Sequence, residues 1–197
     1  MFRDTTSGFG IVSIFFHWVS AVGTLFLFGL GVYLTSYGYY APNFLEIAHL
    51  HYALGIVLLA LVSIRLLWRL INRTPVTLAK SMTAKIGIKL IKFLLYVSLF
   101  AVLLSGYFIC TAEGQTINVF NLFQVPSFVL LETSEVNIAG LTHKYVAWGL
   151  FALVVVHAAA ALFHHFFVKD RTLLRMIKIS NTTKSGFDKN PDNLTHP

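Results

Sequence analysis

Four long apolar stretches dominate the pattern of this chain, and three connections separate them. A helix that crosses a membrane needs about 20 mostly apolar residues, and each stretch is long enough. Three of them carry no Asp, Glu, Lys or Arg, and the second carries only two arginines near one end. The pattern predicts four transmembrane helices, at Ile11–Leu34, Ile47–Leu70, Phe93–Ala112 and Tyr145–Val168. The expected fold class is an all-α membrane protein, a four-transmembrane-helix bundle.

The composition supports the same environment. Of the 197 residues, 56% are apolar and 12% are charged, and this charged share is about half that of a soluble domain. The formal net charge of +7 does not indicate a nucleic-acid partner, because the basic residues flank the apolar stretches instead of forming one patch. We therefore expect a lipid bilayer as the solvent. Residues 1–179 form the expected membrane domain, and 180–197 form a polar tail that we expect to be disordered.

The distribution of Lys and Arg predicts the orientation. Fourteen of the 15 basic residues lie before the first stretch, around the second connection or after the fourth stretch. The first and third connections carry none, and Lys144 lies just beyond the third. Basic residues stay on the cytoplasmic side, so both termini are expected there. The outer side carries Glu46, Glu113, Glu132 and Glu135.

The third connection, Glu113 to Thr142, is unusually apolar but too interrupted to span a membrane. We expect it to lie on the outer surface as an interfacial segment, with a short amphipathic helix as the proposed form.

Seven of the eight histidines lie in or beside the apolar stretches, where ionisable residues are costly and usually functional. His143 and His157 are 14 residues apart. This spacing places both on nearly the same helix face, separated by roughly 21 Å along the axis. Two ligands on one face, at two depths, suit two stacked cofactors.

Depth matching supplies a partner for each of these histidines. His17 lies at the same depth as His157, toward the inner surface. His51 lies at the same depth as His143, toward the outer surface. His49 is also at the outer depth, and spacing alone does not choose between it and His51. Zinc prefers four protein ligands, whereas haem iron needs only two axial ligands because the porphyrin fills the other four positions. The pattern therefore predicts two haems.

Small residues four positions after the candidate ligands agree with a flat macrocycle beside each helix. They are Ala21, Gly55, Ala147 and Ala161, although Ala53 stands in the same relation to His49. Small residues are also common in membrane helices generally.

The remaining candidates are less specific. Arg65 faces the inner end, where it could bind a haem propionate or a quinone, or simply extend to the lipid headgroups. His164 and His165 are expected to have interfacial or propionate-contacting roles. Cys110, the only cysteine, is expected to be a packing residue.

Together these segments resemble the bacterial cytochrome b561 family from about Gly10 to Met176. The matching segments include Phe16-His17-Trp18, Ile64–Arg69, Leu104–Tyr107, His157–His165 and Leu173–Met176. The resemblance implies two b haems bound by His17, His51, His143 and His157, and electron transfer linked to quinone in the inner membrane. It also implies that His51, and not His49, is the haem ligand in the second stretch. The chain departs from relatives at Lys92, where they often carry a histidine.

The expected function is transmembrane electron transfer through two bis-histidine haems, with ubiquinone as a membrane substrate and a periplasmic redox protein or a quinol as the outer partner. One alternative is a haem-bearing anchor subunit of a larger oxidoreductase. A second is a superoxide:quinone oxidoreductase, an activity attributed within the resembled family, although the acidic outer side does not favour an anionic donor. A metal or haem transporter is disfavoured, because the stretches lack carboxylates and prolines.

Overall fold

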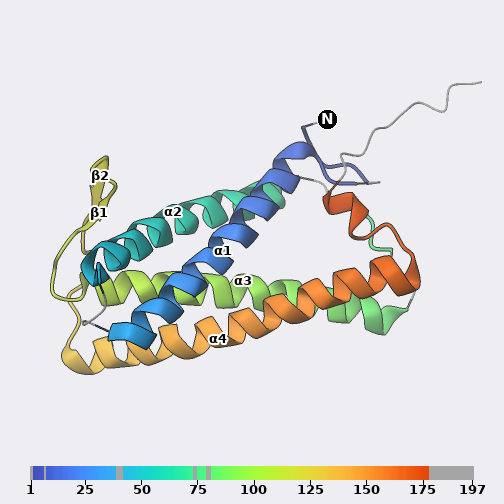
Figure 1. The fold of residues 1–197 in the computed structure, drawn as a ribbon. Coiled ribbons are helices and arrows are strands. Elements are labelled where there is room, and N and C mark those ends of the chain that lie inside the picture. Colours follow the sequence, from blue (N-terminus) through green and yellow to red (C-terminus); the bar gives the residue numbers. More distant parts are fainter. Residues whose placement is uncertain (1, 7, 39–41, 73–74, 79–80, 178–197) are drawn as a thin grey trace, which may run out of the picture.

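A computed structural model describes residues 2–6, 8–38, 42–72, 75–78 and 81–177, and Figure 1 shows its four long helices. All four are long and apolar enough to cross a membrane, so the predicted fold class is confirmed. The helices are α1 (Ile11–Tyr37), α2 (Phe44–Ile71), α3 (Met82–Thr111) and α4 (Thr133–Phe163). Shorter elements are the strands β1 (Ile117–Val119) and β2 (Phe123–Val125), the π-helical turn η2 (His164–Val168) and the 3-10 turn η3 (Leu174–Met176).

Two helices begin well before the apolar stretches that predicted them. Helix α3 starts at Met82, because the Ser81 hydroxyl accepts a hydrogen bond from the backbone N–H of Ala84 at 3.2 Å. Helix α4 starts at Thr133, where Glu132 and Glu135 form a reciprocal capping box. Such caps satisfy the free N–H groups of the first turn. The caps, and not the change in hydropathy, therefore set both starts.

The third connection contains a β-hairpin, so the expected amphipathic helix was wrong. Ile117 pairs with Val125, and Val119 pairs with Phe123, in an antiparallel register. Ile117 and Val119 are buried while the residue between them is exposed. This alternation has the period of a strand and not of a helix. Three residues, Phe120 to Leu122, join the strands. Phe120 and Asn121 both have positive φ, and the backbone N–H of Leu122 closes a tight turn by donating to the carbonyl of Val119 at 3.0 Å.

The helices pack in sequence order: α1 on α2, α2 on α3, and α3 on α4. Helices α1 and α4 make few direct contacts with each other. A cluster of buried apolar side chains occupies the middle of the bundle, namely Leu27, Leu58, Val62, Leu99, Val102 and Leu150. The sparse contact between α1 and α4 leaves room for the histidines that these helices carry.

The described segments nearest the two termini meet at one end of the bundle, and the hairpin lies at the other (Figure 1). The indole N–H of Trp18 donates to the carbonyl of Met176 at 2.8 Å. The backbone N–H of Val76, in the second connection, donates to the carbonyl of Thr6 at 3.0 Å. This arrangement agrees with four crossings that begin and end on the same side. The predicted tail, 180–197, lies outside the described residues.

Candidate functional site

The four histidines predicted as ligands meet in two pairs. On the hairpin side, His51 of α2 faces His143 of α4, with ring centres 6.2 Å apart and planes at 73°. On the side of the termini, His17 of α1 faces His157 of α4, with ring centres 6.4 Å apart and planes at 75°. The first pair is called the outer pair and the second the inner pair. The partners are those that depth matching predicted.

The ring separation within each pair is the separation that a shared metal ion requires. Two imidazoles on opposite sides of one metal, each with its nitrogen about 2.0–2.1 Å away, have ring centres roughly 6.3 Å apart. No group of three or more His, Cys, Asp or Glu side chains that could hold a metal occurs among the described residues. Each pair therefore offers two axial ligands only, a donor set that suits haem iron, whose porphyrin supplies the other four.

The surroundings of His143 leave one ring nitrogen free for a metal. Its Nδ1 lies 2.8 Å from the carbonyl oxygen of Val102 and 3.3 Å from the Ser105 hydroxyl. A carbonyl only accepts hydrogen bonds, so Nδ1 carries the proton and donates it to Val102. The lone pair is then on Nε2. A backbone carbonyl that fixes the tautomer in this way is a common partner of metal-binding histidines.

Glycine on α3 makes room for the same ring. A Cβ atom at Gly106 would lie 2.9 Å from Cε1 of His143, closer than real Cβ contacts allow. On the other side of the outer pair, a Cβ at Gly31 would lie 3.5 Å from Cε1 of His51. Neither glycine was predicted from the sequence as part of the site, although Gly106 lies in the matching segment Leu104–Tyr107.

A cavity of about 420 Å³ lies beside the outer pair, and all four helices line it. Its lining includes Gly55 and Ala147, two of the small residues expected beside a macrocycle. His51 also lines it, and the Nδ1 atom of His51 is buried without a hydrogen-bond partner among the described residues. His49 is exposed and does not line the cavity. The structure therefore orients His51, and not His49, toward the outer site.

Arg65 lies beside the inner pair. Its Nη1 donates to the Ser20 hydroxyl at 2.6 Å, and its Nη2 lies 3.0 Å from Nδ1 of His17. The guanidinium carbon is 5.6 Å from the centre of the Tyr96 ring. Sequence analysis missed Ser20, which is almost fully buried. A hydroxyl three positions after His17 in an apolar helix was the signal that could have identified it.

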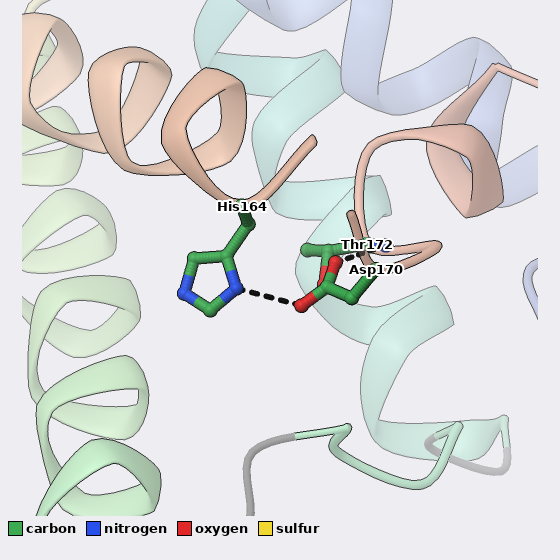
Figure 2. Close-up of polar contacts among 3 residues, drawn as sticks. All are labelled: His164, Asp170 and Thr172. Carbon is green, nitrogen blue, oxygen red and sulfur yellow. Dashed lines mark hydrogen bonds and ion pairs between the residues drawn. The ribbon is translucent and has the colours of Figure 1, made fainter. Parts of the chain in front are cut away.

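His164 and His165 lie at the inner end of α4, where the helix changes to the π-helical turn η2. Figure 2 shows His164 facing Asp170, with 2.6 Å between Nδ1 and the carboxylate. Burial alone would raise the pKa of Asp170. Hydrogen bonds from the Thr172 side chain and backbone N–H, and from His164, outweigh it and lower the pKa. This contact ties the chain after α4 back to the end of the helix.

The family model for prokaryotic cytochrome b561 matches residues 8–178. Cytochrome b561 homolog 2 of Escherichia coli (strain K12) is 36% identical over 182 residues, which cover 92% of this chain and 97% of that protein. A Yersinia pestis protein named "Probable superoxide oxidase CybB" is 29% identical over 133 residues, or 65% of this chain and 73% of that one.

Proposed function

Because the chain belongs to the prokaryotic cytochrome b561 family, whose members are membrane electron-transfer proteins with b-type haem, we propose that it carries electrons across the membrane through two haems. The inner site would use His17 and His157, and the outer site His51 and His143. The observation that carries this proposal is the pair of ring separations, 6.4 and 6.2 Å, each close to the value for two axial imidazoles on one iron.

Placement of both sites on one helix supports a path between them. His143 and His157 both belong to α4, and their spacing corresponds to roughly 21 Å along the helix axis. Haem iron, when bound, supplies a one-electron ferric–ferrous couple. The chain's own part is to hold the axial nitrogens, to exclude water with apolar side chains and to set the local charge. The sites therefore lie at two depths of the bilayer, one near each surface.

We propose that the inner end exchanges electrons with membrane quinone and that both termini are cytoplasmic. The orientation is supported by the sequence, in which 14 of the 15 basic residues lie before the first span, around the second connection or after the fourth span. The described termini also meet at one end of the bundle (Figure 1). The location would then be the bacterial inner membrane. At the outer end, a periplasmic redox protein or a quinol is the proposed partner. The described outer surface presents exposed Glu46, Glu113, Glu132 and Glu135 and a single cation, Lys144.

Reconstitution tests this function. The purified protein is placed in proteoliposomes, with a reductant outside that cannot cross the lipid and a water-soluble electron acceptor enclosed inside. Electrons should reach the acceptor only when haem is bound. Adding ubiquinone to the lipid should increase the rate. A matched preparation of the His157→Ala variant should lose the transfer and keep the outer haem. Equal transfer by the variant and the wild type would contradict the proposed path.

A further inference from the structure

Arg65 brings a positive charge into the helical bundle beside one of the two histidine pairs. Arginine stays protonated in proteins. The guanidinium is fixed by two contacts, a hydrogen bond to the buried Ser20 hydroxyl at 2.6 Å and a contact with Nδ1 of His17 at 3.0 Å. Ser20 in turn donates to the carbonyl of Phe16 at 2.6 Å. The charge is therefore held at the inner pair by a short chain of hydrogen bonds.

No carboxylate of the described residues neutralises this charge. The one ion pair in the described part of the chain joins His164 and Asp170. The guanidinium also lies over the face of the Tyr96 ring, at 5.6 Å, and the nearby charges of Arg69 and Lys92 are positive as well. An aromatic face attracts a cation but carries no net charge. The guanidinium therefore acts on the inner pair as a positive charge without a carboxylate counter-ion, in surroundings where screening is weaker than in bulk water.

The contact with His17 shows how Arg65 would behave once iron is bound. Because arginine can only donate, Nδ1 of His17 is the acceptor here. A histidine that binds iron through Nε2 carries its proton on Nδ1, which then repels a donor. Nη2 would turn away from Nδ1, whereas the bond from Nη1 to Ser20 does not depend on the tautomer. The positive charge would stay at the inner site in the loaded protein.

The outer pair has the opposite surroundings. The Nδ1–H of His143 donates to the Val102 carbonyl at 2.8 Å. Such a bond makes the imidazole a more basic ligand, which favours the ferric state. Lys144, the basic residue next in the chain, is exposed, and its ammonium lies over the Tyr145 ring at 5.8 Å. The polar partner of the outer ligand His143 is thus a neutral carbonyl, whereas that of the inner ligand His17 is a charged guanidinium.

We propose that Arg65 raises the reduction potential of the inner haem above that of the outer haem and so directs electrons inward. This inference rests on the proposed function. Reduction adds one negative charge to the iron centre, and a fixed cation nearby stabilises the reduced form. With both haems bound, each transfer would move one electron from the outer site, oxidised from ferrous to ferric, to the inner site, reduced from ferric to ferrous.

Optical redox titration of the purified haem-loaded protein tests this proposal. We expect two midpoint potentials in the wild type. Arg65→Gln should lower the higher midpoint potential. At a fixed potential, the ratio of reduced to oxidised inner haem should then fall about ten-fold or more. The other midpoint should not move. Arg65→Lys should restore most of the loss, because it keeps the charge. Lys89→Gln, which removes a charge from an exposed position on α3, should leave both midpoints unchanged.

A second titration identifies the haem without changing Arg65. The His143→Ala variant should keep only the inner haem, and that haem should titrate at the higher of the two wild-type potentials. Titration at the lower potential would overturn the proposal, as would unchanged midpoints in Arg65→Gln. If Arg65→Lys lowered the higher midpoint potential as much as Arg65→Gln does, packing and not charge would be responsible, and the proposal would be overturned too. Haem quantitation separates these results from failure of the proposed function, which would show as fewer than two haems in the wild type.

Discussion

His143 and Val102 are joined by a hydrogen bond of 2.8 Å from the imidazole Nδ1–H on α4 to a backbone carbonyl on α3. This bond fixes the ring tautomer and leaves the lone pair on Nε2, and the ring centre of His51 is 6.2 Å from that of His143. The ring can approach α3 this closely only because residue 106 is glycine. One residue without a side chain therefore controls the position of a proposed iron ligand.

Replacing Gly106 with alanine should weaken the outer haem site selectively. The added Cβ would lie 2.9 Å from Cε1 of His143, and overpacking of this kind costs about 1–3 kcal/mol. We expect partial or complete loss of one haem, measured by haem extraction and optical spectroscopy, with the inner haem retained. Gly29→Ala is the matched control, because nothing lies within 4 Å of a Cβ there. Equal haem content in the two variants would contradict the assigned role of Gly106.

The sequence predicted the four helices because lipid imposes a simple rule on length and hydropathy. It also predicted at which end of the bundle each pair lies, since depth in a helical bundle follows directly from position in the chain. The choice of His51 over His49 came from the family resemblance and not from depth. It did not predict the hairpin, because a surface segment with ten apolar residues can form either element. Only the burial of Ile117 and Val119 against α2 distinguishes them. Contacts between helices, such as Gly106 with His143 or Ser20 with Arg65, depend on helix rotation, which no local pattern specifies.

The carboxyl group of Asp170 should titrate below its ordinary pKa of about 3.9. Its hydrogen bonds to Thr172 and His164 favour the ionised form. The hydrogen bonds of the Asp170 carboxylate therefore stabilise the turn after α4 fully above the ordinary pKa. This stabilisation is lost as the pH falls through the lowered pKa of Asp170. Carbon-13 NMR of aspartate-labelled protein measures this midpoint, and Asp170→Asn assigns the resonance.

Thr172→Val is the informative comparison in the same NMR experiment. It removes the hydroxyl and keeps the backbone N–H that donates to the carboxylate at 2.8 Å. The midpoint should rise partway toward the ordinary value. An Asp170 midpoint at or above 3.9 in the wild type would show that these hydrogen bonds do not govern its pKa.

Reduction of the haems by superoxide should be slow and should not decline as salt is added. Attractive steering of an anion raises on-rates by about ten-fold or more, but four exposed glutamates and one exposed lysine form the charged outer surface. Stopped-flow spectroscopy with pulsed superoxide measures the rate. Near-diffusion-limited reduction that slows with rising ionic strength would refute this prediction. It would favour the activity printed in the name of the Yersinia pestis relative.

A reporter fused after Pro197 should be active in the cytoplasm. The basic residues predict this orientation, and a matched fusion in the hairpin turn at Asn121 should report the opposite side. Paired fusions of a phosphatase that works only in the periplasm and a fluorescent protein that works only in the cytoplasm measure both positions. Periplasmic activity at Pro197 would invert the proposed direction of electron flow.

The ratio of haem to protein in variants of His49 and His51 gives the sharpest test of the proposal that two histidine pairs each bind one haem. The two histidines are two residues apart on α2, but His51 faces His143 while His49 is exposed. We predict two low-spin haems per chain in the wild type, two in His49→Ala and one in His51→Ala, by extraction and reduced-minus-oxidised spectra. A single haem in the wild type would contradict the proposed two haem sites. So would a His51→Ala variant that keeps both haems while His49→Ala loses one.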